Sequence, residues 1–443
     1  MEFYGQSHLR QIQMHLRNDT GCPEEDTMQW LTWAFLIAVA AETLTRLWLG
    51  SRQIAAVEAH RDEVPAPFRG QVALADQQKA ADYTVARVRL GRWATVVEAL
   101  VKLGVTLGGG LAIIDALWRH SGLAEPWRGA CIVATLLLLL QLVGQPFSVW
   151  RTFRIEARFG FNRISPRLYA LDFAKQLLLS VLLGGPLLLA TLALMDGAGA
   201  RWWVWVWLIW LAWTLGLTWA APKFIAPLFN RFSPLADEGL KKRLESLLER
   251  CGFAARGGVF VMDGSLRSAH GNAYFTGIGR NKRIVFFDTL LSRIEAEEIE
   301  AVLAHELGHF RLHHVRQRLV ASVLLTFGGL ALLAWLARQP GFYGALGVPV
   351  PSAEMALLLF VMTVPVFAFF TTPVMSWWSR RHEREADDFA ADHADAGKLA
   401  AALVKLFRDN AATLTPDRIH SAFFDSHPPA LERIGRLNAS VSR

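Results

Sequence analysis

The sequence predicts a mainly α-helical, polytopic membrane protein with about seven transmembrane helices. Of its 443 residues, 53% are hydrophobic and 17 are tryptophan, and the mean hydropathy is +0.26. Soluble domains are less apolar, so this composition indicates an integral membrane protein. Seven windows are long and apolar enough to cross a bilayer. They are Trp30–Leu49, Trp93–Leu117, Ala130–Trp150, Gln176–Met195, Trp202–Ala221, Leu319–Ala337 and Met355–Met375.

The second window is the least apolar, because it contains Glu98, Lys102 and Asp115. A buried amphipathic helix outside the membrane is the alternative interpretation. We favour a span, because Glu98 and Lys102 are four residues apart in the order that forms an ion pair on a helix. Such a pair can face a polar interior between membrane helices.

The basic residues are unevenly distributed along the chain. They gather in residues 51–92, in residues 151–175 and in the C-terminal tail, while the connections near His120 and Gly197 carry almost none. The positive-inside rule then places the N-terminus outside and the long basic segments in the cytoplasm. Topology therefore explains the net charge of +7, and we find no motif for nucleic-acid binding.

Arginine greatly outnumbers lysine, from which we expect a bacterial inner membrane.

The clearest chemical motif is the run His305-Glu306-Leu307-Gly308-His309. Histidines four apart on a helix lie one turn above each other, so both can bind one metal ion. H-E-x-x-H on a helix is the pattern of zinc metalloproteases, in which the histidines bind zinc and the glutamate is the general base. Residues Ser292–Glu295 have the form of a capping box, which predicts that this helix begins near Leu291.

The three cysteines lack the spacing of a disulfide framework or metal site.

The third metal ligand must come from elsewhere, because the glycine and histidine that continue a metzincin motif are absent after His309. The charged run over residues 379–392 predicts a helix, which alone could be a solvated surface helix. Glu383 and Asp387 are four apart and share a face, whereas Glu385 points about 200° away from Glu383. With the two histidines, Glu383 gives the carboxylate that a two-histidine, one-glutamate zinc site needs, and Asp387 gives a carboxylate beside it.

Two short β-type runs, Asn272–Thr276 and Arg283–Phe287, flank the glycine-rich residues 277–281, which is a hairpin signal. A further short strand is expected at Val259–Met262. In zinc proteases such an edge strand can pair with an extended peptide and hold its scissile bond over the metal. The hairpin could equally serve only to cover the metal-binding helix, and the spacing leaves both interpretations open.

A histidine precedes the last helical run, in Ser426-His427-Pro428-Pro429. Prolines are favoured at helix starts, so an ordinary loop that enters a final helix is one interpretation. A histidine held just before that rigid start could also donate a hydrogen bond to a developing oxyanion.

These motifs occur in the order found in integral-membrane zinc endopeptidases, and the chain resembles the CAAX prenyl protease 1 family in particular. The resemblance runs from about Trp30 to Leu437. Further matching motifs are Ser51–Gln53, Phe159–Asn162, Pro227–Phe232 and His270–Phe275. The resemblance implies seven membrane helices around a large intramembrane chamber, with one zinc ion near its cytosolic side and a zincin-type catalytic region that carries the small β-hairpin.

The resemblance also implies a role for each matching residue. The implied metal ligands are His305, His309 and Glu383, with Asp387 behind them; the catalytic residues are Glu306 and His427; and the substrate-binding residues are Asn272 and Ala273. The expected partners are the lipid bilayer and a peptide or membrane-protein substrate, prenylated substrates included.

The chain divides into four segments on this interpretation. Residues 1–221 contain spans one to five, 222–318 the catalytic insert on the cytoplasmic side, 319–375 spans six and seven, and 376–443 a helical region that completes the zinc site. Two alternatives stay open: a zinc protease for quality control of membrane proteins, and a seven-helix transporter or receptor with structural zinc. Structural zinc sites are usually closed by four protein ligands, which argues against the second.

Overall fold

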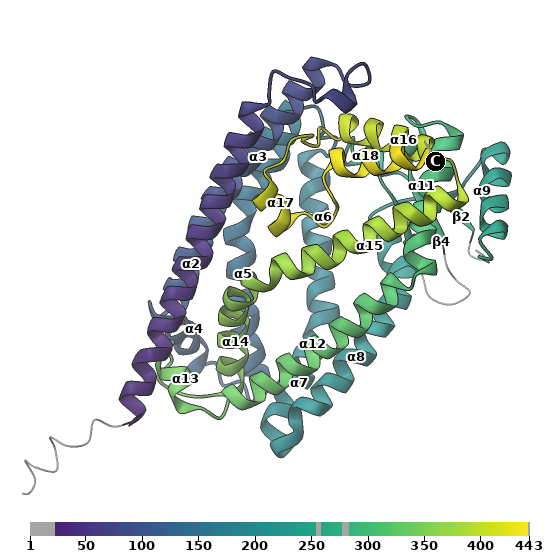
Figure 1. Ribbon diagram of the computed structural model, residues 1–443. Helices are drawn as coiled ribbons and strands as arrows, with labels where there is room; N and C mark the ends of the chain where they lie inside the picture. The colour runs from purple at the N-terminus through teal and green to yellow at the C-terminus, as the bar shows by residue number, and fades with distance from the viewer. Residues whose placement is uncertain (1–22, 254–257, 277–282, 442–443) are drawn as a thin grey trace, which may run out of the picture.

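The computed structural model describes residues 23–253, 258–276 and 283–441 and is mostly α-helical (Figure 1). The helices are α2 (Pro23–Ala59), α3 (Leu74–Val105), α4 (Gly110–Arg119), α5 (Trp127–Trp150), α6 (Pro166–Leu179), α7 (Gly185–Gly197), α8 (Trp202–Ala220), α9 (Glu238–Arg250), α10 (Asp288–Leu291), α11 (Ala296–Arg311), α12 (His314–Leu336), α13 (Pro340–Gly344), α14 (Ala353–Ala368), α15 (Thr372–His393), α16 (Ala396–Asp409), α17 (Arg418–Phe424) and α18 (Ala430–Val441). The strands are β1 (Phe232–Pro234), β2 (Val259–Met262), β3 (Ala273–Thr276) and β4 (Arg283–Phe287).

Within the described chain, six helical segments are long and apolar enough to cross a membrane. They are Gln29–Ala59, Trp127–Glu156, Pro166–Gly197, Gly199–Leu228, His314–Leu336 and Ala353–His393. The pair α3 and α4, bent by 54°, makes a seventh candidate. Each of the seven expected windows overlaps one of these, which confirms the predicted fold class. The last span differs from expectation, because α14 continues through a short turn into α15 and does not end near Met375.

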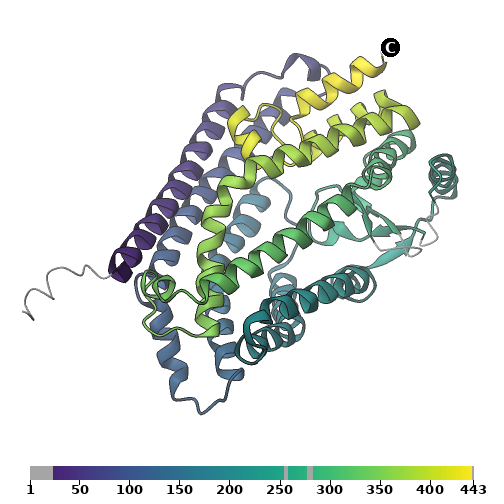
Figure 2. The same cartoon turned by 60° about the horizontal axis from the view of Figure 1, so that its bottom comes forward.

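The second span is broken, and its ion pair is not the expected one. Gly109 between α3 and α4 has a φ of +79°, a left-handed conformation that a glycine adopts without strain. Lys102 donates to Glu42 of α2 at 2.9 Å, and not to Glu98. The reason is that α2 and α3 lie side by side (Figures 1 and 2), so Lys102 meets a carboxylate that is buried and requires a cation.

The spans surround a hollow interior. Figure 1 shows α2 and α3 along one side of the molecule and α8 and α12 along the opposite side. Most residues of the spans Pro166–Gly197 and Gly199–Leu228 are not covered by the rest of the protein: in the most apolar stretch of each span, only 6% of the residues are buried. Two cavities of about 540 and 830 Å³ open between the helices, the first lined by polar groups such as Arg267 and Asp172 and the second mainly by apolar side chains of α7, α12 and α14.

A four-stranded sheet lies beside α11, the helix of the H-E-x-x-H motif, in the order β1-β2-β4-β3. β2 and β4 are parallel, while β3 pairs antiparallel with β4, with Ala273 opposite Phe286. The expected hairpin and the strand Val259–Met262 are therefore confirmed, although the hairpin's turn lies outside the described residues. Because β3 is at the edge of the sheet, one of its sides is open to a further strand.

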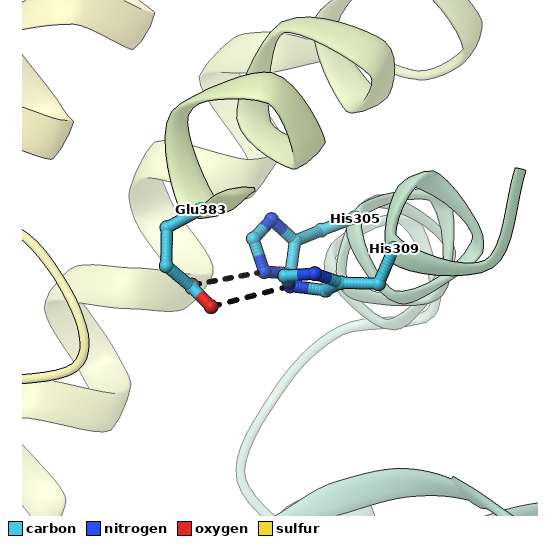
Figure 3. Close-up of side chains that lie close together, drawn as sticks. All are labelled: His305, His309 and Glu383. Atoms are coloured by element: carbon cyan, nitrogen blue, oxygen red, sulfur yellow. Dashed lines mark ion pairs between the residues drawn. The ribbon is translucent and has the colours of Figure 1, made fainter. Parts of the chain in front are cut away.

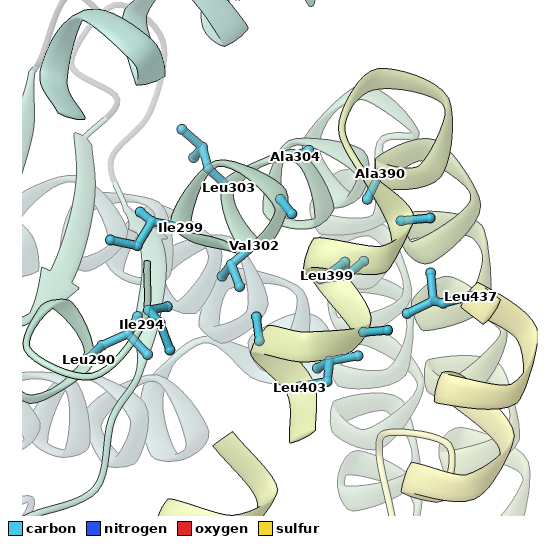
Figure 4. Close-up of a cluster of buried hydrophobic side chains, with 14 of the residues drawn as sticks. Leu290, Ile294, Ile299, Val302, Leu303, Ala304, Ala390, Leu399, Leu403 and Leu437 are labelled. Atoms are coloured by element: carbon cyan, nitrogen blue, oxygen red, sulfur yellow. The ribbon is translucent and has the colours of Figure 1, made fainter. Parts of the chain in front are cut away.

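One apolar core joins this sheet to helices that are distant in sequence. Leu290 after β4, Leu303 of α11, Leu399 of α16 and Leu437 of α18 are all almost fully buried in it (Figure 4). This core brings the C-terminal helices against α11. It thus holds the residues after the last span in contact with the H-E-x-x-H helix.

The start of α11 corrects the predicted capping box. The cap is formed by Glu295 and Glu298, and the helix begins at Ala296 instead of near Leu291. Ser292 is instead the C-cap of α10, where its backbone N–H donates to the carbonyl of Asp288 and its hydroxyl donates to the carbonyl of Thr289. Glu298 is nearly fully buried, and Lys405 of α16 compensates its charge at 2.7 Å.

The topology can be tested with reporter fusions placed after Gly122, Gly197 and Gly341. We expect all three to report the outer side, because the positive-inside rule places the basic segments within the cytoplasm and α3 and α4 together then form one crossing. A periplasmic phosphatase and a cytoplasmic fluorescent protein make complementary reporters. A cytoplasmic signal after Gly122 would show that α3 and α4 form a re-entrant loop and would refute the seven-span topology.

Candidate active site

The site is built where α11 crosses α15, and small residues allow the crossing to be close. A Cβ atom added to Gly308 would lie 3.0 Å from Cα of Ala386, and Ala386 is fully buried. Two backbones can approach in this way only where the side chains between them are minimal. Gly308 lies within the H-E-x-x-H motif, so the crossing brings both of its histidines to α15.

Three side chains converge across this crossing (Figure 3). Nε2 of His305 lies 3.4 Å from one carboxylate oxygen of Glu383, and Nε2 of His309 lies 3.2 Å from the other. One nitrogen or oxygen atom from each residue lies within 4.8 Å of the other two. His305 and Glu383 are buried and His309 is partly buried.

A second layer of charge orients His305. Its Nδ1 lies 2.8 Å from Asp387, one turn after Glu383 on α15. Nε of Arg433 on α18 donates to the same carboxylate at 2.9 Å, and all these side chains are nearly fully buried. Asp387 accepts the Nδ1 hydrogen of His305, so in the neutral ring the lone pair is on Nε2, which faces Glu383.

Glu306 lies on the adjoining face of α11 and lines a cavity of about 180 Å³. The cavity is also lined by His305, His427, Asn272 and Ala273, so it collects the expected catalytic and substrate-binding residues. Desolvation raises the pKa of the Glu306 carboxyl above its ordinary value. A carboxylate with a raised pKa is a stronger base toward a water molecule held in this cavity.

The edge strand reaches the cavity at Asn272 and Ala273. The amide N–H of Phe287 donates to the carbonyl of Asn272, so in the register of β3 and β4 the N–H of Ala273 faces away from β4. The side-chain oxygen of Asn272 accepts this N–H at 2.8 Å. Asn410, which directly follows α16, holds the preceding residue Gly271, because its side-chain oxygen accepts the N–H of Gly271 at 3.2 Å.

His427 lies in the loop between α17 and α18 and is exposed to the cavity. Its Nε2 is 3.4 Å from Glu383, and Ser426 contacts its Nδ1 at 2.9 Å. When the Ser426 hydroxyl donates to Nδ1, Nε2 carries the hydrogen and can donate it. Arg380 of α15 anchors the loop, because its guanidinium donates to the carbonyl of Asp425 at 2.9 Å.

The group of His305, His309 and Glu383 fits a metal ion. One oxygen of Glu383 is buried and accepts no hydrogen bond from the described residues. Such an atom is costly to bury unless a cation compensates it. Two imidazole nitrogens and one carboxylate are the protein ligands of a catalytic zinc site that keeps an open position.

Three side chains that support these groups could not be identified from the sequence, namely Arg433, Arg380 and Asn410. Arg433 and Arg380 belong to runs with several other basic residues, and periodicity does not distinguish a buried arginine from its exposed neighbours. Asn410 follows the end of α16, where a polar residue is ordinary. Their roles depend on contacts between distant segments.

Two histidines and a glutamate converge across two helices, beside the cavity lined by Glu306 and an open strand edge, within a membrane-spanning fold. This combination is typical of integral-membrane metallopeptidases. Residues 53–231 match the family model described as CAAX prenyl protease N-terminal, five membrane helices, and residues 234–441 match Peptidase family M48. The chain therefore belongs to peptidase family M48 and carries the N-terminal membrane region of CAAX prenyl proteases. It is a metalloendopeptidase integral to the membrane.

Individual relatives agree with this assignment. CAAX prenyl protease 1 of Saccharomyces cerevisiae is 37% identical over 332 residues, which cover 70% of this chain and 72% of the yeast protein. The homologue from Oryza sativa is 36% identical over 345 residues, covering 75% of this chain and 80% of its own. The crystal structure of S. mikatae Ste24p superposes with a TM-score of 0.83 at 29% identity, over 93% of this chain and 98% of that one. These similarities do not support a transporter, a receptor or a quality-control protease.

The close crossing of α11 and α15 can be tested with Gly308→Val. The added side chain must displace Ala386, so we expect a loss of folding stability of about 1–3 kcal/mol and weaker zinc binding. Thermal unfolding and zinc content of the purified protein measure both effects. The matched control is Gly435→Ala on α18, where an added Cβ meets nothing within 4 Å. If the valine variant bound zinc as tightly as the wild type, the crossing would not set the ligand spacing.

Proposed function

We propose that this chain is a zinc endopeptidase that hydrolyses peptide bonds of membrane-associated substrates. The observation that carries the proposal is that His305, His309 and Glu383 converge beside a cavity lined by Glu306, His427 and the edge of β3. In this proposal the first three residues hold one zinc ion, and Asp387 and Arg433 fix the orientation of His305.

Zinc bound there would supply a water molecule of lowered pKa and polarise the scissile carbonyl. Glu306 accepts a proton from the attacking water and returns it to the leaving amine. His427 donates a hydrogen bond from Nε2 to the oxygen of the tetrahedral carbon, where negative charge develops.

The substrate enters this arrangement as an extended strand. The open edge of β3 offers the backbone of Ala273, once the Asn272 side chain releases the N–H that it caps. The relatives are named CAAX prenyl proteases, so a prenylated CAAX peptide is the first substrate to test. The apolar cavity of about 830 Å³ gives an isoprenyl chain a suitable environment within the membrane.

We further propose that the active site faces the cytoplasm. The arginine-rich segments are expected on the same side of the spans as the zinc helix, and the positive-inside rule places such segments in the cytoplasm. The relatives described above are eukaryotic. A bacterial inner membrane stays a prediction from the arginine-rich composition of this chain.

Glu306→Gln separates metal binding from catalysis. We expect the variant to keep one zinc ion per chain and to lose cleavage by at least about 10²-fold, because the ligands remain while the base is lost. Zinc analysis and cleavage of a prenylated CAAX peptide are run on the same preparation. Glu297→Gln, a more exposed site on the same helix, is the control and should behave as wild type. Full activity of Glu306→Gln would refute the proposed base.

His427→Ala tests the proposed oxyanion donor. Loss of one such donor costs about 10²–10³ in kcat, so we expect a fall of that size, a KM changed much less and an unchanged zinc content. The control is His393→Ala, at the exposed end of α15 and away from the cavity. A higher KM with an unchanged kcat would assign His427 to substrate binding instead.

A further inference from the structure

A second group of polar side chains lies directly behind the metal triad. Nδ1 of His309, on the side of the ring opposite to Glu383, is 3.0 Å from Nδ1 of His314. Nε2 of His314 is 2.9 Å from a carboxylate oxygen of Glu385, and Arg381 donates to the other oxygen of Glu385 at 2.9 Å. His314 is only 1% exposed, so its contact with His309 is shielded from water, whereas Glu385 and Arg381 reach the surface, with 37% and 62% of their side chains exposed.

The backbone places His314 in this position. It is the first residue of α12 and follows α11 after the two residues Leu312 and His313. His313 has a φ of +61°, which is uncommon for a residue other than glycine. This left-handed residue separates α11 from α12 within a two-residue connection, and the His314 ring lies against His309 of the last turn of α11.

The hydrogen bonds assign the protons along the chain of groups. An ionised Glu385 can only accept, so the hydrogen on His314 is on Nε2, and Nδ1 of a neutral His314 is an acceptor. When a metal ion lies between His309 and Glu383, Nε2 of His309 binds it through its lone pair, and His309 then carries its hydrogen on Nδ1, where Nδ1 of His314 accepts it.

We propose that His314 is a positioning residue which, with Glu385, fixes the tautomer and orientation of His309 for metal binding. The inference rests on the proposed function, because it takes His309 to be a zinc ligand. Metal-bound histidines nearly always donate their other N–H to a partner that fixes the ring. His305 contacts the carboxylate of Asp387 on α15 directly. His309 instead contacts His314, which contacts the carboxylate of Glu385 on the same helix.

The same side chains could instead be read as a second metal site, because His314, His382 and Glu385 each offer a ligand atom within 4.8 Å of the others. Two observations argue against it. The rings of His314 and His382 stack with centroids 4.0 Å apart and planes 7° apart, so their in-plane lone pairs cannot converge on one ion. Both nitrogens of His314 are already engaged, by His309 and Glu385.

The test is the zinc dissociation constant of the full-length, detergent-purified protein, measured by competition with a zinc chelator. His314→Phe keeps the stacked ring but removes the acceptor, and we expect zinc binding to weaken by about 10–100-fold. Glu385→Gln keeps an acceptor oxygen and should retain most of the affinity, whereas Glu385→Leu should lose it. His382→Phe is the matched control, since it alters the same buried stack outside the hydrogen-bonded chain and should change affinity by less than about threefold.

The outcomes separate this proposal from the proposed function. Thermal unfolding of the zinc-free variants shows whether each one folds. If His314→Phe does not fold, the comparison of Glu385→Leu with the wild type provides the test. If the wild type binds one zinc ion and cleaves peptide while His314→Phe and Glu385→Leu bind zinc equally tightly, the positioning role is refuted and the proposed function stands. A wild type that binds two zinc ions and loses one in His382→Phe would also overturn it. A wild type that binds no zinc would refute the proposed function itself.

Discussion

The close contact between Gly308 and Ala386 is the constraint on which the site depends. A helix presents residues i and i+4 on one face, so His305 and His309 span the glycine that touches α15. On α15, Glu383 and Asp387 span Ala386 in the same way. Each helix thus places its polar pair on either side of a small residue. The close approach of Gly308 to Ala386, where an added Cβ would lie 3.0 Å from Cα of Ala386, sets the spacing of all four groups.

Burying these charges requires compensation, and the C-terminal helices provide it. Asp387 is paired with Arg433 of α18, and Glu298 at the start of α11 with Lys405 of α16. Removing one partner of such a pair leaves an uncompensated buried charge, which is strongly destabilising. The last helices of the chain therefore do more than cover the apolar core: they neutralise the carboxylates that hold α11 and the proposed zinc ligands in place.

Much of this arrangement could be predicted from the sequence, because it depends on local patterns. Apolar windows predicted the spans, and spacings of four residues placed His305 with His309 and Glu383 with Asp387. What could not be predicted depends on the packing of distant segments. Lys102 pairs with Glu42 because α2 lies against α3, and Ser292 is used by α10 and so cannot cap α11. Arg433 and His314 acquire roles only once α18 and α12 are placed against α11 and α15.

The central claim is that one zinc ion lies at the crossing of α11 and α15. The most direct measurement is an anomalous difference map, recorded above and below the zinc absorption edge, from crystals of the purified protein. The account predicts one strong peak bounded by Nε2 of His305, Nε2 of His309 and the carboxylate of Glu383. A peak at His314, His382 and Glu385 instead, or no zinc peak at the crossing in protein that cleaves peptide, would contradict it.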